Sequence, residues 1–143
     1  GSAQQLWLQA QLSANSSKCT LAYMHHPRFS SGTHGDYEPL RDLWATLEEN
    51  RVDVALAGHD HNYERLAPLT ADGTLAPPDG IQSFVVGTGG TYLRPAEKGR
   101  LGSEVLLDRY HGVLALELEQ ASYRWRFIDT AGAVRDEGSR TCG

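Results

Sequence analysis

The spacing of apolar residues predicts alternating helices and strands in the first part of the chain. Helix-forming residues fill positions 3–15, and positions 37–50 repeat apolar residues at the intervals of a one-faced amphipathic helix. Those apolar residues are Leu40, Leu43, Trp44 and Leu47. The apolar runs 19–24 and 52–58 do not alternate, which predicts short strands covered on both faces. Strands that alternate with helices predict a parallel sheet with helical cover.

The rest of the chain has the pattern of antiparallel strands. Residues 70–80 are rich in turn formers, and residues 81–90 form an apolar strand that ends in glycines. Residues 112–120 and 122–130 both alternate between apolar and polar positions, which predicts neighbouring antiparallel strands. The shared face of the second strand consists of Tyr123, Trp125 and Phe127. The sequence therefore predicts an α/β (α+β) fold, parallel at first and antiparallel afterwards.

Length and charge narrow the classes of protein. The chain has 143 residues, which suits one domain, and its net charge of -5 leaves no broad basic surface for nucleic acid or an acidic membrane. No apolar stretch approaches the roughly 20 residues that a membrane-spanning helix needs. Gly1 and Ser2 are typical of the residues left after tag removal, so we expect the domain over residues 3–143. The lack of a visible secretory signal therefore carries no weight.

The chain has two cysteines, Cys19 and Cys142, which are either free thiols or a disulfide. Cys142 lies in the polar stretch 137–143, where a free thiol would gain nothing from burial. This favours a disulfide, which would indicate an oxidising compartment and a secreted or extracytoplasmic protein.

Histidines follow both predicted strands of the first part. His25 and His26 follow the first strand, and His59 and His61 follow the second strand through Gly58. Because parallel strands end at the same edge of a sheet, we expect these side chains to lie near one another. Neutral imidazole is a common ligand of zinc, iron and manganese, so the pattern favours a metal site over isolated surface or core histidines.

Other polar residues near these histidines allow further roles. His26 and His34, on the loop after the first strand, could transfer protons near neutral pH. Asp60 and Asn62 are interpreted as turn formers or as secondary contacts of the site. The glycines at 87–90 favour a tight chain reversal over a phosphate cradle, because no P-loop lysine and no helical pattern follow them.

Three segments together resemble a known family. Residues 22–32 (AYMHHPRFSSG), 52–65 (VDVALAGHDHNYER) and 84–90 (FVVGTGG) resemble the C-terminal half of calcineurin-like metallophosphoesterases, closest to the purple acid phosphatases. The likeness extends over nearly the whole of residues 3–143. It implies part of a four-layer α-β-β-α sandwich and a parent enzyme that hydrolyses phosphoric esters. In such enzymes a bridging hydroxide attacks phosphorus between two Fe, Zn or Mn ions.

The resemblance also implies roles for individual residues. His25 and His59 match ligands of the second ion, and His61 matches a ligand of the first. His34 matches a histidine that contacts the phosphate and assists the leaving group. His26, together with Asp60 and Asn62, would support the ligands or contact the substrate.

The family's remaining ligands come from an N-terminal half that this sequence lacks. It has no Gly-Asn-His element, and the pair Gly35 and Asp36 is not followed by the required Tyr or Asp. We therefore expect weak or no metal binding and negligible hydrolysis from this chain alone, with the N-terminal half and a phosphate ester as its partners. A missing half should also leave an apolar sheet edge or face.

Two other classes remain open. The chain could be a binding or interaction module that keeps the fold without the chemistry. It could instead be a mononuclear zinc protein that uses His25, His59 and His61.

Overall fold

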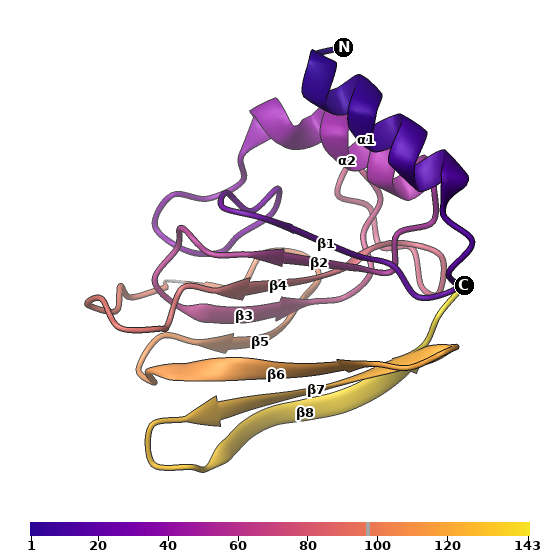
Figure 1. Ribbon diagram of the computed structural model, residues 1–143. Helices are drawn as coiled ribbons and strands as arrows, with labels where there is room; N and C mark the ends of the chain where they lie inside the picture. Colours follow the sequence, from indigo (N-terminus) through magenta and orange to yellow (C-terminus); the bar gives the residue numbers. More distant parts are fainter. Residues whose placement is uncertain (97) are drawn as a thin grey trace.

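The computed structural model describes residues 1–96 and 98–143 (Figure 1). Within them the chain forms two α-helices, a short 3-10 helix and eight strands. In chain order these are α1 (Ala3–Ala14), β1 (Leu21–Met24), η1 (Glu38–Leu40), α2 (Arg41–Glu49), β2 (Val54–Ala57), β3 (Tyr63–Leu66), β4 (Gln82–Val86), β5 (Ser103–Leu107), β6 (Gly112–Leu118), β7 (Ser122–Asp129) and β8 (Val134–Thr141). Neither helix is long and apolar enough to cross a bilayer.

The strands form two sheets. The first has the order β1-β2-β4-β3-β5, in which β1, β2 and β4 are parallel and β3 runs antiparallel to both of its neighbours. The second is the antiparallel sheet β6-β7-β8, in which Tyr123, Trp125 and Phe127 share the buried face. The predicted α/β class, with parallel strands followed by antiparallel ones, is confirmed.

The elements stack as helices, first sheet and second sheet, as Figure 1 shows from top to bottom. Alternate side chains of β2 serve the two interfaces: Ala55 packs under the helices, whereas Val54 packs against the second sheet. Trp44 and Leu47, at helical spacing on α2, are both buried against the first sheet. The chain thus contains an α-β-β stack, three of the four layers that the family resemblance implies.

Strand β1 differs from the prediction. We expected residues 19–24 to form a strand covered on both faces, but Tyr23 is 83% exposed. The reason is that β1 is the edge strand of the first sheet, with β2 as its neighbour on one side only. An apolar groove beside this edge is lined by Tyr23, Met24, Leu56, Ala57, Gly58, Val86, Gly89, Gly112, Val113 and Leu114.

The C-terminal stretch also differs from the polar tail that the sequence indicated, because most of it is strand β8. The strand brings Cys142 to Cys19, and the two form a disulfide with their Cα atoms 5.2 Å apart. The disulfide preference drawn from the sequence is confirmed. It ties the segment before β1 to the end of β8, as the position of the C-terminus in Figure 1 shows.

A buried polar network joins the two sheets at Asp136 on β8. Its carboxylate accepts hydrogen bonds from the Tyr63 hydroxyl at 2.6 Å, from Arg65 Nε at 2.8 Å and from Trp125 Nε1 at 3.1 Å. Burial of Asp136 opposes its ionisation, but the Arg65 bond and charge and the other two bonds outweigh burial and hold the pKa of this carboxyl below its usual value. The network fixes β3, which follows the second pair of histidines, against the second sheet.

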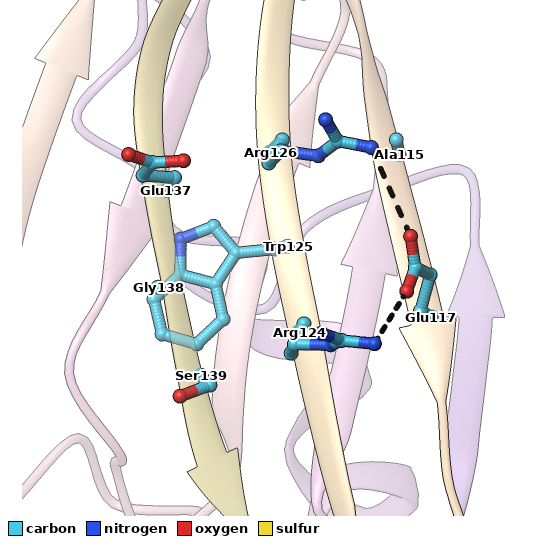
Figure 2. A pocket seen from close by; sticks show the side chains of 8 residues that line it. All are labelled: Ala115, Glu117, Arg124, Trp125, Arg126, Glu137, Gly138 and Ser139. Atoms are coloured by element: carbon cyan, nitrogen blue, oxygen red, sulfur yellow. Dashed lines mark hydrogen bonds and ion pairs between the residues drawn. The ribbon is translucent and has the colours of Figure 1, made fainter.

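The outer face of the second sheet carries exposed charges around a shallow pocket (Figure 2). Arg124 and Arg126 approach Glu117 at 3.0 and 3.8 Å from the neighbouring strand, and the Trp125 ring lies beside Gly138. Exposed pairs of this kind contribute little to stability. None of the candidate site residues lines this pocket.

Candidate metal and phosphate site

The register of β1 and β2 brings the two histidine pairs together. Met24 pairs with Ala57, so the residues that follow, His25 and Gly58, leave the sheet side by side. The Gly58 N–H donates to the His25 carbonyl oxygen at 3.0 Å. His59 then takes a positive φ of 60°, which is uncommon for a residue with a side chain and often marks a functional position.

Three imidazoles converge at this edge. His25 Nε2 lies 3.2 Å from His59 Nδ1, and one nitrogen from each of His25, His26 and His59 lies within 4.8 Å of the others. The His34 ring joins them, with its centroid 4.2 Å from that of His59. His26 also stacks on Tyr37 at 4.5 Å between ring centroids, which fixes its orientation.

The surroundings favour the neutral form of His59, which is the form that binds metal. Burial is the largest cause that lowers the pKa of His59, and the three neighbouring imidazoles lower it further. The nearby carboxylate of Asp60 acts in the opposite direction but does not outweigh them. The donor set therefore fits a cation that prefers nitrogen ligands, such as zinc or iron.

His61 points to a different neighbour. Its Nδ1 lies 2.9 Å from the carbonyl oxygen of Tyr92, and its ring packs edge-on against the Tyr92 ring. Because a carbonyl only accepts, Nδ1 carries the proton and Nε2 keeps a free lone pair. A backbone carbonyl in this position is the usual way in which a protein orients a metal-binding histidine. The structure groups His26, rather than His61, with His25 and His59.

His34 is held by the buried carboxylate of Asp60. Asp60 is 1% exposed, and its Oδ1 lies 2.7 Å from His34 Nδ1 and 3.0 Å from the His34 backbone nitrogen. Its other oxygen accepts from the Ser30 hydroxyl. Burial opposes ionisation of Asp60, but the hydrogen bonds from Ser30 and His34 outweigh it and lower the pKa of this carboxyl. Asp60 thus anchors the His34 loop, a larger role than turn formation.

Asn62 lies deeper than the sequence indicated. It is 1% exposed, and neither polar atom of its side-chain amide has a hydrogen-bond partner among residues 1–96 and 98–143. Its backbone carbonyl accepts from the Gly87 N–H at 3.0 Å. The side chain of Asn62 therefore makes no hydrogen bond to the histidine rings in the described part of the chain.

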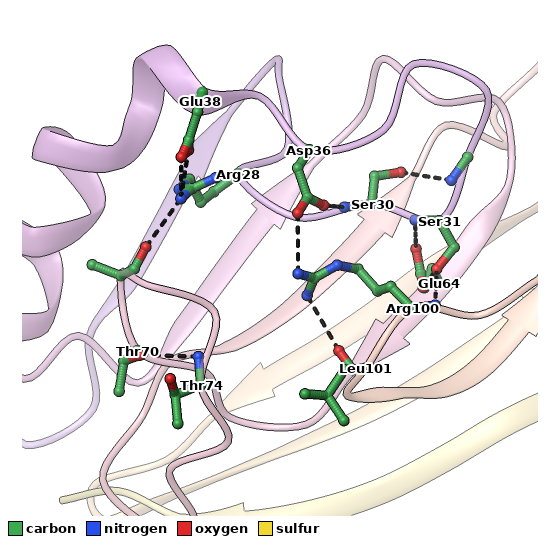
Figure 3. Close-up of polar contacts among 12 residues, drawn as sticks. Arg28, Ser30, Ser31, Asp36, Glu38, Glu64, Thr70, Thr74, Arg100 and Leu101 are labelled. Carbon is green, nitrogen blue, oxygen red and sulfur yellow. Dashed lines mark hydrogen bonds and ion pairs between the residues drawn. The ribbon is translucent and has the colours of Figure 1, made fainter.

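The loop after β1 is braced from below, as Figure 3 shows. The Ser31 backbone nitrogen and hydroxyl both donate to the fully buried carboxylate of Glu64 on β3, the former at 2.7 Å. Asp36 accepts from the Ser30 backbone nitrogen and from Arg100, each at 3.0 Å. Four contacts therefore fix the loop that carries His34.

Among the glycines of residues 87–90, Gly87 has a packing role. A Cβ on Gly87 would overlap the Asp60 carbonyl oxygen, so only glycine lets the end of β4 pass so close to the turn of residues 59–61. Gly89, by contrast, has no atom within 4 Å of the place where a Cβ would be. The Gly87 N–H is already bonded to Asn62, so it is not directed at a ligand.

Sequence reasoning missed two residues at this site, Tyr92 and Arg94. Arg94 Nη1 lies 2.8 Å from His34 Nε2, and Arg94 Nη2 donates to the Tyr92 hydroxyl at 2.8 Å. A guanidinium only donates, so in this contact His34 Nε2 is the acceptor and Nδ1 is the nitrogen that donates to Asp60. Both residues lie on an irregular segment without periodicity, so no sequence signal places them.

Comparison with known proteins finds similar sequences and similar folds. No family model matches the chain. It is 37% identical over 90 residues to purple acid phosphatase 21 of Arabidopsis thaliana, a match that covers 59% of this chain and 20% of that protein. The chain spans about a fifth to a quarter of the length of the curated relatives it matches.

Solved structures show the same fold. Purple acid phosphatase PPD1 from yellow lupin (Lupinus luteus) seeds matches with a TM-score of 0.84 and 20% identity, over 99% of this chain and 28% of that one. GAP50, described as the anchor in the inner membrane complex of Plasmodium, matches with a TM-score of 0.82 and 20% identity, over 97% of this chain and 42% of that one. The chain thus resembles the C-terminal part of a purple acid phosphatase-like metallophosphoesterase.

Proposed function

We propose that this chain forms the C-terminal half of a metal-dependent hydrolase of phosphoric esters. The observation that carries the proposal is the meeting of His25 and His59, from neighbouring strand ends, beside a His34 oriented by a buried carboxylate. The similarity to purple acid phosphatase 21 supports the same class of reaction.

The histidines would hold two ions of Fe, Zn or Mn. His25 and His59 would bind one ion, and His61, whose Nε2 is left free by its bond to Tyr92, would bind the other. Two such cations supply neutralisation of the phosphoryl charge and activation of a water molecule. Imidazole ligands add no negative charge, which suits an anionic substrate.

His34 would act on the leaving group. The bond from Nδ1–H to Asp60 directs Nε2 away from the buried carboxylate. A proton on Nε2 would stabilise the alkoxide as it departs. Arg94 occupies Nε2 in this structure, so this role requires the guanidinium to turn to another acceptor when substrate binds.

The remaining ligands would come from an N-terminal half that packs on the free edge of β1. Exposed Tyr23 and the apolar groove beside it form a surface that suits a covering segment. The chain alone would then bind metal weakly and hydrolyse phosphate esters negligibly. The disulfide between Cys19 and Cys142 supports a secreted or extracytoplasmic location.

The test compares p-nitrophenyl phosphate turnover by this chain with turnover by the protein extended upstream of Ala3, both loaded with metal. We expect turnover only from the extended protein. His59→Ala should abolish it, whereas His111→Ala, outside the histidine group, should leave it unchanged. Turnover at an ordinary phosphatase rate by the chain alone, or none from the metal-loaded extended protein, would contradict the proposal.

A one-metal site is the second candidate, and the closeness of His25, His26 and His59 favours it. Isothermal titration with zinc separates the two. One-to-one binding that is lost in His26→Ala and kept in His61→Ala would support a mononuclear site.

A third class is a module that keeps the fold and acts as an attachment surface. The description of GAP50 as an anchor favours this class. An extended protein that folds, binds no added metal ion and shows no turnover would support it.

A further inference from the structure

The segment that contains Tyr92 and Arg94 is fixed directly to the second histidine turn. The Arg94 backbone nitrogen donates to the His61 carbonyl oxygen at 3.0 Å, and His61 Nδ1 donates to the Tyr92 carbonyl oxygen at 2.9 Å. These two bonds run in opposite directions between the same two stretches of chain. The position of Arg94 relative to the histidines is therefore set by the backbone and not by its side chain alone.

The guanidinium of Arg94 lies beside an imidazole ring and a phenol hydroxyl. Its nearest polar contacts are His34 Nε2 and the Tyr92 hydroxyl, each at 2.8 Å, and it lies 5.3 Å from the centre of the Tyr92 ring. The Tyr92 contacts hold the side chain toward the histidines. The arginine is half-buried, so its charge is less screened than that of a fully exposed residue.

This charge has no acidic partner in the part of the chain that the structure describes. Most arginines there pair with a carboxylate within 4.0 Å, but none of these ion pairs includes Arg94. Asp60, which bonds the same His34 ring, has both of its oxygens already bonded to Ser30 and His34. The net charge of the chain is -5, yet this guanidinium lies beside imidazoles and has no carboxylate partner among the described residues. An anion would be stabilised at this position.

We propose that Arg94 binds the phosphoryl oxygens of a phosphate monoester at this site, with Tyr92 as a positioning residue. This inference rests on the proposed function and adds a substrate-binding residue to it. The fork of a guanidinium can donate two parallel hydrogen bonds to a phosphate, which a dianionic monoester accepts better than a diester. When the guanidinium turns from His34 to the phosphate, Nε2 of His34 becomes free to face the leaving group.

The test measures binding of inorganic phosphate to the metal-free chain by phosphorus NMR titration in the presence of a chelator. Arg94→Gln removes the charge and should raise the Kd for phosphate about 10- to 100-fold, in line with the strength of charged hydrogen bonds. Arg94→Lys keeps the charge but loses the fork, so its Kd for phosphate should lie between those of the unaltered chain and Arg94→Gln. Arg109→Gln is the matched control, because Arg109 is 90% exposed and lies beside Asp108. The Kd of this variant for phosphate should equal that of the unaltered chain.

Urea midpoints of all variants show whether each is folded before its binding is compared. Equal phosphate affinity in folded Arg94→Gln and the unaltered chain, or no saturable binding by the unaltered chain, would overturn the inference. The readout involves neither metal nor turnover. If the Kd for phosphate depends on Arg94 but the extended protein shows no turnover, only the proposed function is contradicted. If the extended protein turns over substrate but the Kd does not depend on Arg94, only this inference is contradicted.

Discussion

Asp136 gives the sharpest test of how the two sheets are held together. Asp136→Ala removes the acceptor of three donors at once, from Tyr63, Arg65 and Trp125. The Tyr63 hydroxyl and the Trp125 indole lie on side chains that are 0% and 5% exposed, so water does not replace the lost bonds freely.

The expected cost follows from these contacts. Each buried donor left without a partner costs about 1–3 kcal/mol, whereas Arg65 keeps its ion pair with Glu104 and loses less. Together these changes give a loss of about 3–5 kcal/mol in the free energy of unfolding, the range found when one partner of a buried ion pair is removed. Such a loss is a large share of the roughly 5–15 kcal/mol that stabilises a typical domain.

Urea denaturation followed by tryptophan fluorescence measures the loss. With a slope of about 1–3 kcal/mol per molar urea, the midpoint should fall by about 2 M. Asp136→Asn keeps an acceptor oxygen and should lose less than Asp136→Ala. Glu137→Ala, an exposed neighbour on the same strand, should change stability by less than about 0.5 kcal/mol. A cost for Asp136→Ala as small as that of the Glu137 control would refute this account of the sheet interface.

The same carboxyl makes part of the stability depend on pH. Because folding lowers the pKa of Asp136, its ionised form stabilises the fold fully above the unfolded value of about 4, and this contribution is lost as the pH falls toward the folded value. The stability difference between the unaltered chain and Asp136→Asn should therefore narrow as the pH falls below about 4. A difference that stays constant through this window would contradict the lowered pKa.

Two further predictions concern the histidine turn and the disulfide. Gly87→Ala should lower the melting temperature and shift the backbone NMR signals of residues 59–61, because its Cβ would overlap the Asp60 carbonyl oxygen. Gly89→Ala should leave the melting temperature and these signals unchanged. Equal effects of the two variants would contradict the packing role of Gly87. Replacing both Cys19 and Cys142 by Ser should lower the free energy of unfolding by about 4–5 kcal/mol, since the bridge joins residues 123 positions apart. The unaltered chain should show no free thiol in a thiol assay under denaturing conditions. A free thiol in that assay, or unchanged stability, would show that the bridge is not formed.

The meeting of His25 and His59 could be predicted from the sequence because it follows from a general rule about parallel strands. Apolar runs before His25 and before His59 predict parallel strands, and parallel strands end at one sheet edge, so the two residues meet as expected. The grouping of His26 with them could not be predicted. It depends on the stacking of His26 on Tyr37, a contact that no spacing in the sequence determines.

Strand β3 was missed because buried polar residues interrupt its pattern. Glu64 and Arg65 indicate a loop by composition, yet Glu64 is fully buried under Ser31 and Arg65 bonds to Asp136. The family resemblance also extends to these residues, which are not ligands there and would be expected to brace the histidine loop. Glu64 does so, but Arg65 braces the second sheet instead.

Arg94 and the exposure of Tyr23 also lay beyond sequence reasoning. Arg94 stands in an irregular segment, and its approach to His34 is a tertiary contact across 60 positions. Tyr23 belongs to a short apolar run that is equally typical of a central strand and of an edge strand. Only the strand order shows that β1 is an edge.

The central claim is that histidines from two strand ends form one metal-binding site. A zinc titration of the chain followed by NMR of the six histidine side chains tests it most directly. The account predicts weak but saturable binding in which the ring signals of His25 and His59 shift together, while those of His111 do not. Shifts that follow no common binding curve, or that appear only at His111, would contradict it.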